Sequence, residues 1–162
     1  MGFDTGVEIV FNCSQEAAYN WLWDLEKNLS KYSSDFPEGS TKKTNDLTGV
    51  GAQWICYGQQ LKHVDEDDLE GDEKKLKDGA KTICVITEAQ PFSHYIMKSD
   101  IIGLGDTVED FSFTPLEGGK TKCVIKAHAQ FKGLAKLGTP FIKYMMKKYY
   151  AEMKGTIEKM SF

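Results

Sequence analysis

The stretch KCVIKAHAQF, residues 122–131, and the helical pattern that follows over residues 133–160 decide the fold. Every second residue from Cys123 to Phe131 is apolar or small, and mostly polar residues stand between them, which is typical of a strand with one buried face. In the next segment Phe141, Met145 and Tyr149 recur on one helical face, opposite lysines. A two-faced strand beside a long amphipathic helix predicts a sheet that this helix closes.

Upstream segments show the same strand pattern, separated by short turn signals such as Gly118-Gly119. Short turns between successive strands predict an antiparallel meander with one buried and one wet face. The polar residues 38–48 predict an edge strand. The other expected strands cover residues 3–12, 52–61, 81–89, 95–102 and 107–114.

Two short helices are expected after the first strand. Ser14 is placed to cap a helix, and an apolar stripe from Ala18 to Leu29 follows. We expect this helix to break near residues 27–30, with a second short helix reaching Phe36. In the C-terminal helix, Pro140 removes a backbone donor and predicts a kink or a restart.

Length and charge exclude several classes of protein. A chain of 162 residues predicts one domain, 1–162, with a core that needs no metal or disulfide. The net charge is −4, and all 20 basic residues are lysines, which argues against nucleic acid or a polyanion as the partner. We expect a cytoplasmic protein without stable membrane insertion, because no signal-peptide core or long apolar run is present.

No motif indicates a metal or a cofactor, and we expect neither. The four cysteines form no C-x-x-C pair and favour buried reduced thiols, and the three histidines are scattered. Residues 63–81 are strongly acidic with few apolar positions, which predicts an extended hairpin loop. An EF-hand over Asp65–Asp72 is excluded, because its sixth-position glycine and twelfth-position glutamate are missing.

The order of elements resembles the START/polyketide-cyclase superfamily, also called SRPBCC or birch-pollen-allergen-like. The resemblance covers nearly the whole chain, although the acidic residues 63–81 depart from the usual short hairpin. It rests on the segments VEIVFNCS (7–14), AYNWLWDL (18–25), GVGAQW (49–54), TEAQP (87–91) and FSFTPLEGGKT (111–121).

The resemblance implies an α+β helix-grip fold. In that fold a curved seven-stranded antiparallel sheet wraps around the long C-terminal helix and encloses a cavity. It also implies three functions: binding or transport of a hydrophobic small molecule such as a lipid or polyketide, cyclase or dehydratase activity, or protein interaction. The fold alone does not choose among them.

Strand alternation proposes the residues that face such a cavity. Phe111 and Phe113 point inward with Glu109, unless the parity is reversed and Asp110 does so. A carboxylate on an apolar face has a raised pKa and suits acid or base chemistry, so Glu109 and Tyr95 are the candidate catalytic groups. The alternative is that Glu109 lies in water at the mouth of the cavity and has no chemical role. The predicted ligand-binding set is Trp54, Tyr57, Tyr95, Met97, Glu109, Phe111, Phe113, Ile125, Ala127, Phe141, Met145 and Tyr149.

Three hypotheses follow from these candidates. The first is a non-enzymatic binder of a hydrophobic molecule. The second is a polyketide-type cyclase or dehydratase in which Glu109 or Tyr95 donates a proton. The third is an interaction module in which the acidic residues 63–81 contact a basic protein partner.

Overall fold

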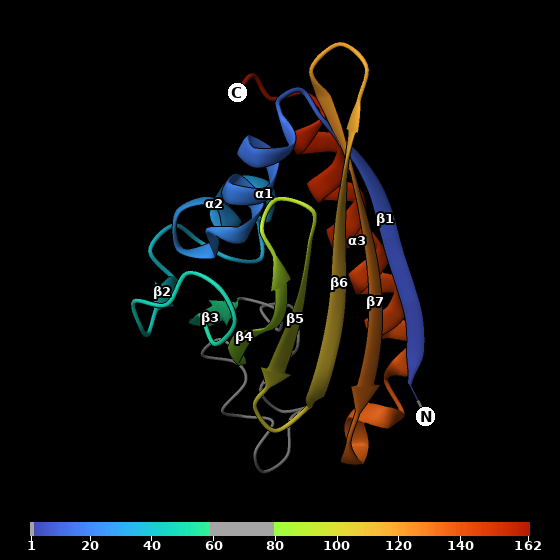
Figure 1. Cartoon of the computed structure of the whole chain (residues 1–162). Coiled ribbons are helices and arrows are strands. Elements are labelled where there is room, and N and C mark those ends of the chain that lie inside the picture. The colour runs from blue at the N-terminus through green and yellow to red at the C-terminus, as the bar shows by residue number, and fades with distance from the viewer. Residues whose placement is uncertain (1, 59–79) are drawn as a thin grey trace.

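The computed structural model describes residues 2–58 and 80–162 and shows one curved sheet with a long helix against it (Figure 1). The seven strands lie in the order β1-β7-β6-β5-β4-β3-β2, and all neighbouring pairs are antiparallel. The strands are β1 Phe3–Phe11, β2 Thr41–Lys43, β3 Gln53–Gly58, β4 Ala80–Gln90, β5 His94–Ile101, β6 Gly105–Leu116 and β7 Lys120–Phe131. The helices are α1 Gln15–Trp23, α2 Leu25–Tyr32, the 3₁₀ turn η3 Gly133–Lys136 and α3 Thr139–Ile157.

The predicted α+β helix-grip architecture is confirmed, including the two short helices after β1 and the long C-terminal helix against the sheet. The meander runs from β2 to β7 in sequence order, and β1 then pairs with β7. The first and last strands of the chain therefore pair along the whole length of β1, from Phe3 opposite Ala129 to Phe11 opposite Thr121.

The expected break within residues 27–30 is wrong, because the two helices separate at Asp24. The Asp24 side chain accepts a hydrogen bond from the Lys27 backbone N–H at 3.3 Å and so caps α2. Ser14 caps α1 as expected, accepting from Ala17 N at 3.2 Å. The apolar stripe from Ala18 to Leu29 continues across both helices, so the pattern did not show where the first one ends. The boundary is set by the short polar side chain of Asp24.

The edge strand is also shorter than expected: β2 covers only Thr41–Lys43 instead of residues 38–48. Its neighbours on both sides are turns and bends, including Gly39, which has a positive φ of 81°. Inside the sheet, β6 is longer than expected: it continues through Pro115 to Leu116, because the β6–β7 hairpin pairs Pro115 with Thr121.

The long C-terminal segment is two elements, because the chain forms the turn η3 and then restarts at α3. Pro140 lies in the first turn of α3, where its missing N–H costs nothing. The two ends of α3 differ in burial: Tyr150, Met153 and Ile157 are buried, whereas Phe141 is 58% exposed.

Two groups of apolar side chains hold these layers together. The larger core lies between the sheet, α1, α2 and the C-terminal half of α3, around Phe11, Leu22 and Trp54. A smaller cluster of Phe3, Ala129 and Phe131 receives Ile142 and Met146 from the N-terminal half of α3. The two ends of α3 are therefore packed against different parts of the sheet.

Most of the predicted acidic hairpin, residues 63–81, lies outside the described residues, and its role as an interaction surface stays a prediction. Within the described residues, no helix has the length and apolar character needed to cross a membrane.

The Asp24 cap makes a direct stability prediction. Replacing Asp24 with alanine leaves an N-terminal N–H of α2 without its acceptor and should lower the free energy of unfolding by about 1 kcal/mol. Asp24→Asn keeps the acceptor and should restore most of it. Asp46→Ala, at an exposed position, is the control. Equal losses in the Asp24→Ala and Asp46→Ala variants in urea denaturation would contradict the capping role.

Candidate functional site: a cavity between the sheet and α3

A cavity of about 470 Å³ lies between the concave face of the sheet and the helices α2 and α3. Its wall is mostly apolar, and the N-terminal half of α3 supplies much of it. The described residues that line it are Leu22, Leu25, Leu29, Tyr32, Asp35, Phe36, Cys56, Thr82, Cys84, Met97, Ser99, Ile101, Leu104, Thr107, Glu109, Phe111, Phe131, Ala135, Gly138, Phe141, Ile142, Met145, Met146, Tyr149, Tyr150 and Met153.

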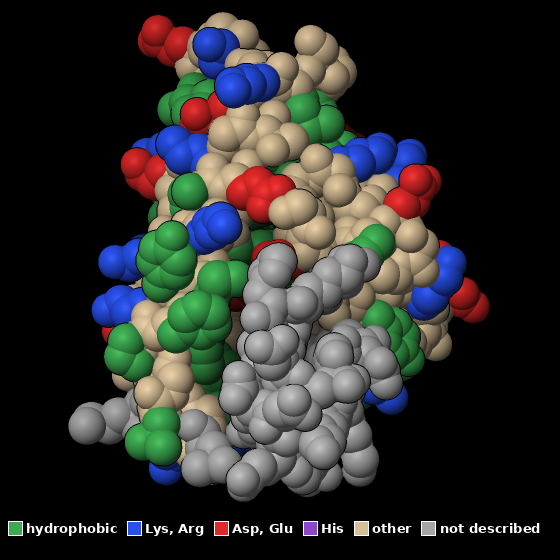
Figure 2. All heavy atoms as spheres, turned by 180° about the vertical axis from the view of Figure 1, so that it is seen from behind, with side chains coloured by type: hydrophobic (Ala, Val, Ile, Leu, Met, Phe, Trp, Pro, Cys, Tyr) green, Lys and Arg blue, Asp and Glu red, His purple; other side chains and the backbone are tan. Residues whose placement is uncertain are grey.

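The cavity reaches solvent beside the start of α3. Phe141 lines it and is also more than half exposed, and its neighbours Leu137 and Tyr144 are exposed as well. From behind, hydrophobic side chains lie among lysines on the side of the molecule that α3 occupies (Figure 2). An apolar molecule therefore has an apolar route toward the interior.

Glu109 is the polar group at the centre of this wall. The alternation of β6 turns Thr107, Glu109 and Phe111 toward the cavity and Asp110 toward the outer face. The hydroxyl of Tyr150 donates a hydrogen bond to Glu109 Oε2 at 2.6 Å. Burial raises the pKa of Glu109, and this hydrogen bond only partly offsets the rise because it stabilises the ionised form.

Three tyrosines lie near enough to Glu109 for its charge to affect their pKa values, and Tyr150 contacts it directly. Tyr149 and Tyr150 come from α3, with their rings 5.2 Å apart, and Tyr32 comes from the end of α2. Burial raises the pKa of all three, and the neighbouring Glu109 raises it further, so these groups stay neutral donors at neutral pH.

Two thiols lie on the same wall, where β3 and β4 pair. Cys56 and Cys84 have their sulfur atoms 3.9 Å apart, and Ser99 Oγ donates to Cys84 Sγ at 3.3 Å. The hydrogen bond from Cys84 lowers the pKa of Cys56, while the same contact and burial raise that of Cys84. Among the described residues, no group of three or more His, Cys, Asp or Glu side chains is arranged to hold a metal.

Six of the predicted ligand-binding residues line the cavity, and six do not. Those on its wall are Met97, Glu109, Phe111, Phe141, Met145 and Tyr149; those away from it are Trp54, Tyr57, Tyr95, Phe113, Ile125 and Ala127. The second group lies away from the cavity for two different reasons: five of its residues are packed in the core, and one lies on the other face of the sheet.

Five of the six are filled core. Trp54 packs edge-on against Trp23 at 5.0 Å, and Tyr95 stacks on Phe111 at 4.4 Å. Phe113 belongs to the same aromatic group, 5.9 Å from Tyr95. Ile125 and Ala127 are 1% and 3% exposed and lie among core side chains. These residues support the wall from behind.

Tyr57 lies on the other face of the sheet and is 46% exposed, because β3 turns Trp54 and Cys56 inward. The prediction for this strand left the parity open between Trp54 and Tyr57, and the structure assigns the inward face to Trp54. Cys56 is the residue of β3 that reaches the cavity.

Sequence reasoning missed the polar groups that come from other elements, above all Tyr150, Tyr32 and Asp35. Tyr149 and Tyr150 are adjacent and identical, so an apolar stripe could not choose between them. Tyr32 and Asp35 reach the cavity only through the packing of α2 against α3, where Glu152 accepts from Ser34 N at 2.9 Å.

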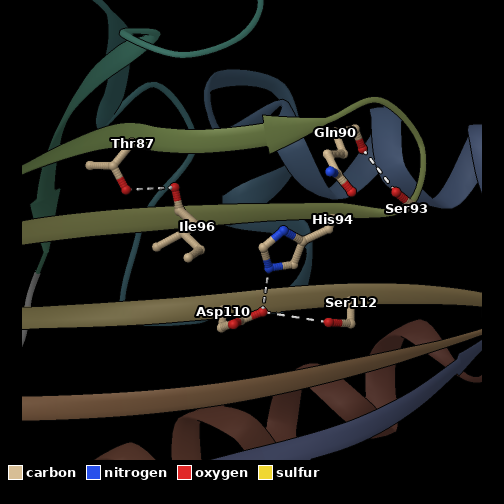
Figure 3. A network of polar contacts seen from close by, with 7 residues as sticks. All are labelled: Thr87, Gln90, Ser93, His94, Ile96, Asp110 and Ser112. Atoms are coloured by element: carbon tan, nitrogen blue, oxygen red, sulfur yellow. Dashed lines mark hydrogen bonds and ion pairs between the residues drawn. The ribbon is translucent and has the colours of Figure 1, made fainter.

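A cluster of polar residues lies on the outer face of the sheet, and it does not form a catalytic triad. His94 Nε2 lies 2.8 Å from Asp110 Oδ1, and Ser112 Oγ donates to the same oxygen (Figure 3). Ser93 Oγ instead donates to the Gln90 carbonyl. Neither serine is hydrogen-bonded to the imidazole, so no base activates a serine nucleophile here.

The raised pKa of Glu109 predicts a pH-dependent loss of stability. The native state holds its proton more tightly than the unfolded chain does, so stability falls as pH rises from the ordinary value of 4.5 through the raised native pKa. Glu109→Gln removes this loss. Its gain in unfolding free energy should be absent at low pH and on the order of 1 kcal/mol at neutral pH.

The control for this measurement is Glu117→Gln, which changes an exposed carboxylate in the β6–β7 hairpin. Urea denaturation over a pH series measures both variants. A Glu109→Gln effect that does not vary with pH would show that Glu109 titrates normally.

Comparisons with known proteins place this architecture. No protein-family model and no curated protein matches the chain. Among solved structures, a START superfamily protein from Mycobacterium smegmatis matches with a TM-score of 0.66 at 10% identity, over 99% of both chains. The Zhui aromatase/cyclase from Streptomyces sp. R1128 matches with a TM-score of 0.71 at 6% identity, over 98% of this chain and 92% of that one.

A third solved structure, that of Ara h 8.0201, matches with a TM-score of 0.62 at 10% identity, over 97% of this chain and 98% of that one. All three likenesses extend over the whole chain and are far too low in identity to carry function. The chain therefore has the fold of the START and aromatase/cyclase structures that it matches.

Proposed function

We propose that this chain binds a hydrophobic small molecule in the cavity between the sheet and α3. The observation that carries the proposal is the cavity itself: about 470 Å³ of space walled mainly by apolar side chains. Small-molecule sites have volumes of roughly 300–1,000 Å³ and apolar walls with a few placed polar groups. Burial of the ligand's apolar surface would supply most of the affinity.

The lining residues form a wall that can adapt to apolar ligands of different shapes. Met97, Met145, Met146 and Met153 face the cavity from opposite sides. Methionine side chains are flexible and polarisable, so they adapt to different apolar surfaces. Fatty, polyketide-like or other apolar molecules fit this description, and carriage of such a molecule between sites is the simplest use of a cavity that opens at one end.

A cyclase or dehydratase is the second candidate, and Glu109 favours it. A carboxyl group with a raised pKa holds its proton to a higher pH than an ordinary glutamate does and can donate it to a bound substrate. Tyr150, at 2.6 Å, would hold the carboxyl group in place. Tyr95 does not line the cavity and is therefore a weaker candidate for proton donor. The aromatase/cyclase among the structural neighbours is consistent with such chemistry in this fold.

Filling the cavity tests the binding proposal. Met145→Trp puts a larger side chain on the cavity wall at a half-buried position. We expect the affinity for an apolar fluorescent probe to fall at least about tenfold, which is about 1.4 kcal/mol. Probe titration of the purified protein measures this, and circular dichroism checks that the fold is kept.

The matched control is Met160→Trp, which makes the same change in the C-terminal segment, away from the cavity. It should leave probe affinity unchanged. Equal affinities for the Met145→Trp variant and the unaltered protein would mean that the probe binds elsewhere and that this cavity is not the site.

A further inference from the structure

We propose that the molecule bound in this cavity carries a positively charged amine that pairs with Glu109. This inference rests on the proposed binding function and specifies the chemical class of the ligand. It assigns to the cavity a preference for apolar amines over apolar carboxylates, with neutral apolar molecules between them.

The first observation is the sign of the charge on the cavity wall. Among the described residues that line the cavity, the carboxylic acids are Asp35 and Glu109, and none is a lysine, arginine or histidine. The chain as a whole has no arginine. A ligand carboxylate or phosphate would therefore enter without a cation to meet it, which costs affinity.

The second observation is that no residue in the described parts of the chain, 2–58 and 80–162, forms an ion pair with Glu109. The groups that face it are Tyr149 and Tyr150 from α3, Tyr32 from α2, Cys84 from β4 and Tyr95 from β5. All are neutral donors or weak acids. Tyr150 donates to Oε2, and no described residue donates a hydrogen bond to Oε1. The Glu109 side chain is half-buried, and the described residues supply a hydrogen bond to only one of its two oxygens, so a ligand ammonium group could donate to the other.

The aromatic rings on the wall reinforce the same preference. Phe111, Tyr149 and Tyr150 line the cavity around Glu109. The faces of aromatic rings carry partial negative charge and attract cations, more strongly where water is excluded. Negative ring faces and a carboxylate together disfavour an anion and favour an ammonium or quaternary ammonium group.

Asp35 does not compete with Glu109 for this role. Lys148 and Glu152, on α3, lie close enough to influence its charge in opposite directions. Asp35 thus already has a lysine near it, whereas the groups of the described chain that face Glu109 are all neutral. The selectivity should therefore depend on Glu109 and not on Asp35.

The test compares three amphiphiles with the same dodecyl chain: dodecylammonium, dodecanol and dodecanoate. Each competes with an apolar fluorescent probe for the full chain at neutral pH, below its micelle-forming concentration. We expect the ammonium compound to bind about tenfold more tightly than the alcohol, and the alcohol more tightly than the carboxylate. This comparison uses the unaltered protein and needs no variant.

The variants then assign the preference to a residue. Glu109→Gln should bring the ammonium compound to within about threefold of the alcohol while leaving the alcohol's affinity unchanged, and Asp35→Asn should keep the original order. Equal binding of the ammonium compound and the alcohol by the unaltered protein, or a preference that survives Glu109→Gln, overturns the inference and leaves the binding function standing. Failure of all three to displace the probe overturns both.

Discussion

The cavity depends on the unequal attachment of α3 to the rest of the molecule. The C-terminal half of α3 is tied to β1: Lys154 Nζ donates to the Glu8 carbonyl at 2.7 Å, and Glu158 Oε1 accepts from Val10 N at 3.1 Å. Met153 and Ile157 are fully buried on this half. The N-terminal half, after the restart at Pro140, is at most half-buried; Ile142 and Met146 pack against the small cluster around Phe131, and Met146 also touches the larger core. The space between this half and β4–β6 is the cavity.

That attachment also places the polar groups. The side chain of Tyr150 lies at the junction of the two halves, where α3 comes close enough to β6 to donate to Glu109. On the other side, Glu152 holds the end of α2 through the backbone and hydroxyl of Ser34. The same helix therefore closes the apolar wall and brings neutral donors to a buried carboxyl group. In the proposed function, apolar burial supplies affinity for a ligand, and Glu109, which has no ion-pair partner among the described residues, supplies selectivity.

The fold was predictable from the sequence because most strands of the meander alternate between apolar and polar residues, which shows the side that is buried. In residues 122–131 the alternation assigns Cys123 and Ile125 to the core, and the same period brings Glu109 and Phe111 to one face of β6. In β3 the run from Trp54 to Tyr57 is apolar throughout, so alternation could not choose the face. The cavity residues of α3 were only partly predictable. Phe141 and Tyr149 were predicted from the helical face, but their neighbours Ile142 and Tyr150 also line the cavity, because its wall takes in more of the helix than one stripe. The contribution of α2 arises from long-range packing that no local pattern reports.

The most direct test of the account uses the methionine methyl groups as reporters in a carbon–proton NMR spectrum of methyl-labelled protein. Four methionines line the cavity, and Met160 lies away from it and serves as an internal reference. On addition of an apolar ligand, the account predicts shifts and ligand-to-methyl nuclear Overhauser effects at Met97, Met145, Met146 and Met153, with Met160 unchanged. Unmoved cavity methyl groups in the presence of bound ligand, or contacts only at Met160, would contradict the claim that this cavity holds the ligand.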